Sequence, residues 1–403
     1  MEFGPIWRSL TRSKSSYVLI VLQIAVTMAI IVNAIAIIQE RTQRMARPSG
    51  VDEDNIFYLA SNTFIDGADN RELIRADLER IRSTPGVVAA FNTNSVPLRN
   101  GGWSMSVSLE PGQQHSGTGV AIYFSDEHAV DTFGLNLVAG RNFRPDEVAF
   151  SDPASNRWPP LGIVTQALAD TLFPEGGSAA LGQTLYINDN DPVQIVGIVE
   201  RLQAPWNGWD GVERSMLVPQ IRDSEFARYV VRAEPGRRDA LMPVIEETLA
   251  GASRERIVDG LQTMTETRQR SYLGDAALIR LLSFVATLLT VITGLGIVGL
   301  ASFNVSRRTR QIGTRRALGA SRAAILRYFM LENFLVTSVG IVLGALLAVG
   351  LNMWMVETFD LARMAWYLVP LAMLILWLVG QLAAAWPARR ASLVPPAVAT
   401  RAV

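Results

Sequence analysis

The sequence predicts a membrane protein with four transmembrane α-helices and a large α+β domain inserted between the first two. Three observations support this fold class: four long uncharged runs, a polar segment between the first two runs, and arginines gathered in short segments elsewhere. The uncharged runs cover 17–38, 281–306, 333–356 and 364–388. At about 1.5 Å per residue, each run reaches the roughly 30 Å of a bilayer core, and the apolar runs of soluble core helices are usually shorter.

We place the membrane spans at 17–38, 281–303, 333–356 and 364–386. Basic residues precede the first run, as they do in a signal peptide. However, its apolar part is too long for one, and no small-x-small cleavage site closes it before Gln39. We therefore expect the first run to remain as an uncleaved span.

The arginines predict the orientation of the spans. Segment 304–327 holds seven arginines and no acid, and the tail 387–403 holds three arginines and no acid. Segment 1–16 is also basic, whereas segment 39–280 holds 33 acids against 23 bases. Because basic loops stay on the cytoplasmic side, both termini and 304–327 are expected in the cytoplasm and 39–280 outside, in a bacterial inner membrane.

Segment 39–280 reads as a folded domain. It alternates strand-like and helix-like stretches, such as the helical spacing of Leu73, Ile74, Leu78 and Ile81, and a similar unit recurs near its end. We interpret the two units as halves of one subdomain, split by a long insertion rich in strands and turns. Residues 39–47 and 264–280 are expected to be helical stalks that run directly into the first two spans.

Composition excludes several kinds of site. There is no cysteine, and Lys14, the only lysine, has no P-loop around it, so ATP hydrolysis is expected in another protein. The net charge of zero argues against nucleic-acid binding. The two histidines, His115 and His128, lack metal-ligand spacing. We expect no catalytic residue, no metal and no cofactor in this chain.

Three small motifs have competing interpretations. Gly294, Gly296 and Gly299 match a dinucleotide fingerprint, but they lie inside a span, where small residues serve helix packing. Gly340, Gly344 and Ala348 form a small-residue face that packs on another helix, either within the chain or across a dimer. The loop 204–211 carries Trp206 and Trp209, which form either a structural turn or a contact surface for a partner.

The loop between the second and third spans carries a family resemblance. Residues 301–350 read ASFNVSRRTRQIGTRRALGASRAAILRYFMLENFLVTSVGIVLGALLAVG. This closely resembles the permeases of MacB and FtsX-like ABC transporters, whose usual pattern is R-T-x-E-I-G-x-R-R-A-L-G-A followed by a helix with L-x-E. Gly140-Arg141-Asn142-Phe143 resembles the family's G-R-x-F, and 387–391 its P-A-R-R-A. The resemblance implies a porter-like subdomain from 48–94 and 223–262, with a second subdomain, 95–222, inserted.

The resemblance also implies a mechanism and partners. Two permeases, identical or homologous, would dimerise and be served by an ABC-type ATPase that binds ATP and Mg. ATP-driven closure would pass through the stalks to the periplasmic domains. The loop would dock on the ATPase through Arg307, Arg308, Arg310, Gln311, Ile312, Gly313, Arg315, Arg316, Ala317, Leu318, Gly319, Ala320 and Ser321. In this interpretation, Ile312, Ala317 and Leu318 are apolar anchors among the arginines.

One position departs from the family pattern: Gln311 stands where the family has glutamate. Three functions remain open. Export with a periplasmic adaptor and an outer-membrane duct ranks first, ahead of FtsX-like mechanotransmission to a periplasmic enzyme and of lipoprotein extraction. A receptor without a copurifying ATPase is the alternative from a different class.

Overall fold

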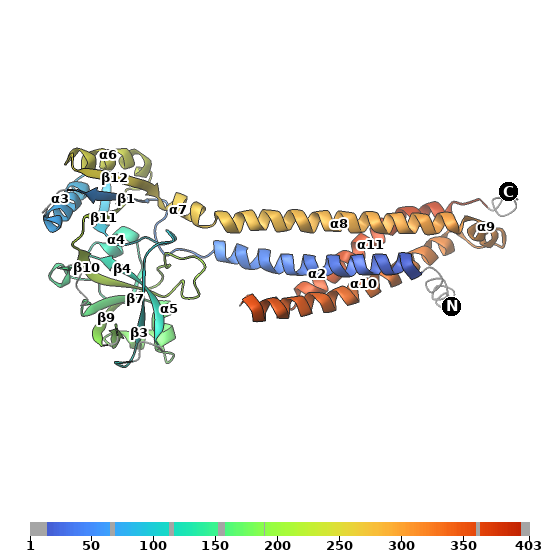
Figure 1. Cartoon of the computed structure of the whole chain (residues 1–403), viewed down its shortest axis with the longest axis horizontal. Coiled ribbons are helices and arrows are strands. Elements are labelled where there is room, and N and C mark those ends of the chain that lie inside the picture. Colours follow the sequence, from blue (N-terminus) through green and yellow to red (C-terminus); the bar gives the residue numbers. More distant parts are fainter. Residues whose placement is uncertain are drawn as a thin grey trace. The chain divides into compact units, whose positions relative to one another are not determined.

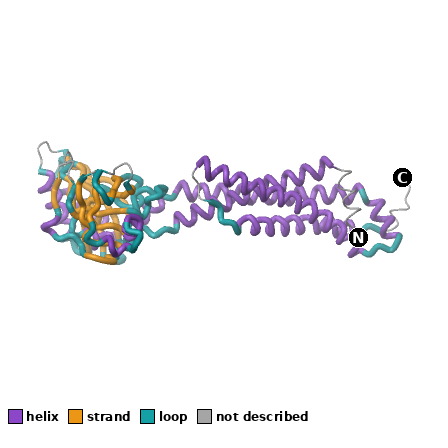
Figure 2. Tube along the Cα trace, turned by 90° about the horizontal axis from the view of Figure 1, so that it is seen from below, coloured by secondary structure: helices purple, strands orange, loops and turns teal. Residues whose placement is uncertain are grey.

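The chain divides into two compact units. The computed structural model describes residues 14–64, 69–112, 117–151, 158–188, 190–359 and 363–395, so His115 lies outside the described residues. A helical unit combines Met1–Met45 with Gly274–Val403, and a globular unit comprises Ala46–Leu273. Within the described residues, strands occur only in the globular unit (Figure 2).

Long apolar helices make up the helical unit (Figure 1). They are α2 (Lys14–Met45), α8 (Leu273–Arg307), α10 (Arg322–Phe359) and α11 (Leu368–Ser392), with the short α9 (Thr309–Ala317) between α8 and α10. Four of these helices are long and apolar enough to cross a membrane. Helix α10 packs on α2 and α11 around a shared apolar core, and Thr27 on α2 hydrogen-bonds Thr293 on α8 at 2.8 Å.

The segment expected to be a second continuous stalk is divided, which corrects the prediction for 264–280. Helix α7 (Met264–Ser271) ends at Tyr272, and α8 begins at Leu273. Helix α7 belongs to the globular unit, where Thr267 is buried and hydrogen-bonds the Tyr58 hydroxyl at 2.9 Å. By contrast, α2 continues past the expected end of the first span to Met45.

One layer of the globular unit is a four-stranded antiparallel sheet in the order β12-β1-β11-β2. Its strands are β1 (Ile56–Thr63), β2 (Val87–Asn92), β11 (Phe226–Ala233) and β12 (Arg256–Thr263), with helices α3 (Asn70–Arg82) and α6 (Arg238–Gly251) packed on it. Strand β1 lies between β11 and β12, which are far away in sequence. One sheet therefore unites the two regions that the sequence suggested were halves of one subdomain.

The intervening segment forms a second, mixed sheet in the order β4-β3-β8-β9-β7-β10-β6, with β5 paired to β9. Its strands are β3 (Trp103–Ser108), β4 (Thr118–Ser125), β5 (Leu137–Gly140), β6 (Ala149–Ser151), β7 (Leu161–Thr165), β8 (Thr184–Ile187), β9 (Asp191–Val199) and β10 (Ser215–Arg222). Because β4 also pairs with β10, six strands close on themselves and only short edges remain. Helix α5 (Gln166–Leu172) packs on β7 and β9 of this sheet, whereas α4 (Ala129–Phe133) contacts β2 and β11 of the four-stranded sheet.

Candidate partner-docking loop

The loop between α8 and α10 owes its shape to a helix C-cap followed directly by an N-cap. Helix α9 ends with Gly319 at φ +94°, a left-handed conformation that favours glycine. The N–H of Gly319 donates to the carbonyl of Arg316 at 3.2 Å, and the N–H of Ala320 to that of Arg315 at 3.0 Å. This is the Schellman pattern. The Ser321 hydroxyl then accepts from the N–H of Ala324 at 3.1 Å and caps α10.

One side of α9 faces the chain's own helices. Ile312 and Gly313 are buried, and Ile312 packs in a small apolar cluster with residues of α8, α10 and α11. The Ile312 side chain therefore holds the loop on the bundle, which corrects the expectation that it is an outward anchor. The half-buried Arg316 likewise turns back, donating to the carbonyl of Ala320 at 3.1 Å.

The opposite side of the loop is exposed, basic and partly apolar. Leu318 is 83% exposed, an unusual setting for a leucine. The other exposed residues of the loop include Arg307, Arg310, Gln311, Thr314, Arg315, Ala317, Gly319 and Ser321. The Arg315 guanidinium lies 5.0 Å from the centre of the Tyr328 ring. The outward surface therefore presents cations around a single large apolar side chain.

A polar cluster fastens the loop to three helices. The Arg308 guanidinium lies 3.1 Å from the Glu332 carboxylate on α10. The Tyr17 hydroxyl on α2 donates to the same carboxylate at 2.6 Å and accepts from Asn304 on α8 at 2.9 Å. Glu332, Asn304 and Tyr17 are buried. Polar groups in such an apolar setting are costly unless paired, so the four side chains stabilise one another.

Of these four residues, only Arg308 is a site residue predicted from the sequence. A signal for Glu332 was present, since it is the only acid between Asp275 and Glu357 and it stands immediately before a long apolar run. An acid at such a position marks a functional or structural contact. Tyr17 and Asn304 carry no comparable signal, because both residue types are ordinary near the end of a span.

The small residues of α10 pack within the chain. A Cβ added at Gly340 would lie 2.8 Å from the Cβ of Ile24, and one at Gly344 would lie 2.7 Å from the Cβ of Met28. Ala348 is fully buried on the same side. Helix α2 therefore occupies this face, which corrects the alternative that it forms a dimer contact. In α8, an added Cβ at Gly296 would meet Gln23, whereas one at Gly299 would meet nothing within 4 Å in the described part of the chain.

The tryptophan loop is a structural turn. Trp206 and Trp209 are partly buried, pack against the apolar core of the globular unit and meet edge to face at 5.9 Å. A Cβ at Gly119 would come within 2.9 Å of the Trp209 ring. The packing supports the structural alternative over the contact surface. In the described part of the chain, no group of three or more His, Cys or acidic residues could hold a metal ion.

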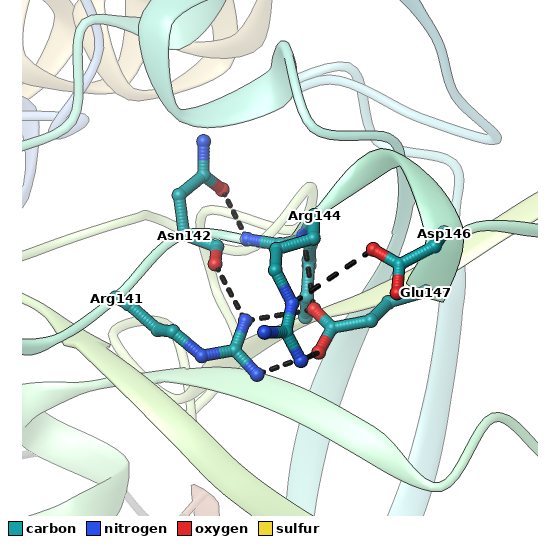
Figure 3. A network of polar contacts seen from close by, with 6 residues as sticks. Arg141, Asn142, Arg144, Asp146 and Glu147 are labelled. Carbon is teal, nitrogen blue, oxygen red and sulfur yellow. Dashed lines mark hydrogen bonds and ion pairs between the residues drawn. The ribbon is translucent and has the colours of Figure 1, made fainter.

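Residues 140–143 also serve structure (Figure 3). The Arg141 guanidinium contacts both carboxylate oxygens of Glu147, at 2.7 and 2.6 Å, and Phe143 is buried. The side chain of Asn142 donates to the carbonyl of Glu127 at 2.7 Å. Hydrogen bonds from Arg141 lower the pKa of Glu147 to about 2, with further bonds from Arg144. The motif thus fastens a turn within the globular unit.

Comparison with known families agrees with this architecture. The family model described as "MacB-like periplasmic core domain" matches residues 17–247, which is more than half of the chain. The chain belongs to the MacB-like family of ABC transporter permeases. A second model, "FtsX-like permease C-terminal", matches residues 283–396, which include most of α8, the loop after it, and helices α10 and α11. The predicted family and fold class are therefore confirmed.

Curated relatives share about a quarter of their residues with this permease. The uncharacterized ABC transporter permease YknZ of Bacillus subtilis is 24% identical over 74% of each chain. The macrolide export ATP-binding/permease protein MacB of Bartonella henselae is 27% identical over 81% of this chain and 48% of its own length. The MacB protein of Agrobacterium fabrum is 26% identical over 70% of this chain and 41% of its own length. The chain thus spans less than half the length of these MacB relatives.

Solved structures include domains similar to the globular unit. The periplasmic region of MacB from Actinobacillus actinomycetemcomitans is 14% identical, with a TM-score of 0.34, over 57% of this chain and 97% of that one. The extracellular domain of YknZ is also 14% identical, with a TM-score of 0.32, over 50% of this chain and 100% of that one.

Proposed function

We propose that this chain is the permease subunit of an ABC transporter of the MacB type. In this proposal, an ATPase on a separate polypeptide binds ATP and Mg, docks on the loop between α8 and α10, and drives movement of the globular unit. The main support is the loop itself, an exposed basic and apolar surface fixed to three helices through Arg308 and Glu332. A surface fixed in this way passes force to the helices instead of yielding locally.

The proposal places the docking loop and both termini in the cytoplasm and the globular unit outside, in the inner membrane of a bacterium. The supporting observation is the charge distribution. Segment 304–327 carries seven arginines and no acid, and segment 39–280 carries an excess of acids. Arginine-rich loops are retained on the cytoplasmic side. Membrane lipids then cover the exposed apolar faces of the four long helices.

The partner surface should be acidic with an apolar recess. Arg310 and Arg315 supply positive charge, and Leu318, three residues after Arg315, is the one large exposed apolar side chain of the loop. Complementary charge directs association, whereas a buried apolar anchor supplies affinity. At position 311 the family usually has a negatively charged glutamate, whereas this chain has the neutral Gln311. The ATPase surface that faces Gln311 should therefore lack the cation that would pair with a glutamate.

Movement would reach the globular unit through α2 and α8. Helix α2 runs without a break from Lys14 to Met45. Near its end, the guanidinium of Arg41 lies 2.7 Å from the carboxylate of Asp275 on α8. The Asp275 side chain is nearly buried, which strengthens the pair relative to an exposed one. The two helices that lead into the globular unit are thus tied together.

Export is the proposed task, together with a second permease, a periplasmic adaptor and an outer-membrane duct. Relatives named as macrolide exporters and a globular unit with two sheets favour export. FtsX-like mechanotransmission to a periplasmic enzyme and lipoprotein extraction are the alternatives. A neighbouring gene for an adaptor would support export, whereas a neighbouring cell-wall hydrolase would support mechanotransmission.

Leu318→Asp tests the docking surface. Leu318 is exposed and contributes little to the fold, so the variant should insert in the membrane as the wild type does. Recovery of the ATPase with the affinity-purified chain in mild detergent should fall at least about tenfold, equivalent to about 1.4 kcal/mol of binding. The purified chain without the partner should show no ATPase activity.

The matched control is Leu181→Asp, which makes the same change at an exposed leucine of the globular unit. It should leave ATPase recovery unchanged. Equal recovery of the ATPase with Leu318→Asp and with the wild type would show that the arginines of the loop only set the membrane orientation of the chain. Intrinsic ATPase activity that survives removal of contaminants would refute the separate ATPase.

A further inference from the structure

The globular unit contains an open polar cavity of about 450 Å³ that none of the functions above uses. Its size is that of a small-molecule site. Three parts of the globular unit line it: the loop after β2, the tryptophan loop through Asn207, and α7 with the adjoining strands β1 and β12. The cavity therefore lies where the two sheet-containing layers and α7 meet.

Hydrogen bonds hold the loop after β2 in an unfavourable backbone conformation at the cavity. Leu98 and Asn100 have φ angles of 65° and 64°, in the left-handed region that non-glycine residues rarely adopt. The N–H of Asn100 donates to the carbonyl of Pro205 at 2.9 Å. Leu98 is buried, whereas Arg99 between the two is exposed. Such strain is retained where surrounding structure enforces it, often at ligand-binding sites.

The cavity is rich in donors and carries positive charge. Arg99 and Arg270 both line it, and no acidic residue is among its lining residues. Within the described part of the chain, neither guanidinium forms an ion pair with a carboxylate. Burial, with a smaller contribution from the nearby Arg99 charge, lowers the pKa of Arg228 to about 10.

Hydrogen bonds within the wall of the cavity fix two of its neutral side chains, Gln262 and Asn207. The Tyr58 hydroxyl donates to the amide oxygen of Gln262 at 2.8 Å. The NH₂ group of the same amide therefore points away from Tyr58. Asn207 donates its own NH₂ group to the carbonyl of Ser271 at 2.8 Å and thereby fixes the wall. A ligand would thus meet two guanidinium groups and an amide donor, a set that matches anionic oxygens.

We propose that this cavity binds a small anionic molecule bearing a carboxylate or phosphate group, with Arg99 and Arg270 as its cationic ligands. Arg99 comes from the strained loop and Arg270 from α7, so a bound anion would bridge the two. Helix α7 is followed, after Tyr272, by α8. Occupancy would therefore stabilise the segment through which the chain enters its second long helix.

The test uses the full chain in nanodiscs of zwitterionic lipid, titrated with sodium phosphate or sodium succinate at constant ionic strength. We expect one or both probes to raise the thermal unfolding midpoint saturably, with chloride as the reference. A response to phosphate alone identifies a phosphate site and a response to succinate alone a carboxylate site. Nanodiscs with anionic phospholipid test a lipid headgroup as the source, because they would compete with the soluble probe.

The decisive variant is Arg99→Gln combined with Arg270→Gln, which should weaken probe binding at least about tenfold. Both side chains are exposed, so the fold should be retained, and each single variant should weaken binding by a smaller factor. The matched control Arg254→Gln changes an exposed arginine outside the cavity and should bind as the wild type does. The absence of any saturable response in the wild type, or equal binding by the double variant and the wild type, would overturn the proposal.

Discussion

Replacing Glu332 by glutamine should weaken the attachment of the docking loop to the helices. The glutamine keeps the size of the side chain and can still accept the hydrogen bond from Tyr17, but it removes the negative charge that faces Arg308 at 3.1 Å. Arg308, with only 18% of its side chain exposed, would lose the charge of Glu332. The substitution therefore tests the ion pair with little change in packing.

The expected cost follows from the burial of both partners. Removing one member of a fully buried pair costs about 3–5 kcal/mol, because the other charge remains unpaired. Arg308 keeps some access to solvent, and the Tyr17 hydrogen bond survives, so we expect about 2 kcal/mol for Glu332→Gln. Tyr17→Phe removes one hydroxyl that both donates and accepts, which should cost about 1–2 kcal/mol.

The assay is reversible unfolding of the purified chain in detergent, together with recovery of the ATPase. Because Tyr17 and Glu332 are in contact, the double variant should lose less free energy of unfolding than the sum of the single variants. The matched control is Glu357→Gln, an exposed acid on the same helix, which should change the free energy by no more than about 0.5 kcal/mol. ATPase recovery should fall with Glu332→Gln and not with the control. Equal effects of the two glutamine variants would refute the reasoning.

Two further predictions concern packing and pH. Gly344→Leu should lower the unfolding midpoint of the helical unit and cost about 1–3 kcal/mol or more, because an added Cβ would lie 2.7 Å from the Cβ of Met28. Gly350→Leu should be tolerated, because no atom of the described residues lies within 4 Å of a Cβ added there. Equal midpoints for the two variants would contradict the packing of α10 on α2. Glu147 has its pKa lowered from 4.5 to about 2, so its pairing with Arg141 stabilises the fold above about pH 4.5 and is lost as the pH falls toward 2. Because the Arg141 side chain is 42% exposed, we expect the pair to contribute only about 1 kcal/mol to the free energy of unfolding. Below about pH 5, the wild type should therefore lose stability more steeply than Glu147→Gln. Identical slopes for the two proteins would contradict this prediction.

The number and type of membrane helices could be predicted from the sequence because the signal is local. An uncharged run either reaches across a bilayer or does not, and four runs in this chain do. The end of α9 is also a local matter. Gly319 takes a left-handed conformation that few other residues adopt, and Ser321 caps the next helix. The local sequence Leu318-Gly319-Ala320-Ser321 is therefore almost sufficient to specify the turn.

Only the tertiary structure decided which side chains meet across the helices. Tyr17, Asn304 and Glu332 are far apart in sequence and form one cluster because α2, α8 and α10 have particular rotations about their axes. Hydropathy along a span that is apolar on every side carries no information about that rotation. The sequence also could not tell that Ile312 faces inward, because a lone large apolar side chain on a polar helix can pack on the chain's own helices or on a partner.

The boundary of the globular unit was likewise a tertiary matter. The residues of α7 are polar and helical, and by composition they extend naturally into α8. Their assignment depends on contacts with distant strands, such as the hydrogen bond between the hydroxyls of Thr267 and Tyr58. The sequence by itself determined the local conformations of this permease and its membrane-spanning helices, because these follow from short-range sterics and from transfer of apolar runs into lipid. The polar cluster, the intrachain use of the glycine face and the positively charged cavity follow from the tertiary structure, because each depends on residues that only packing brings together.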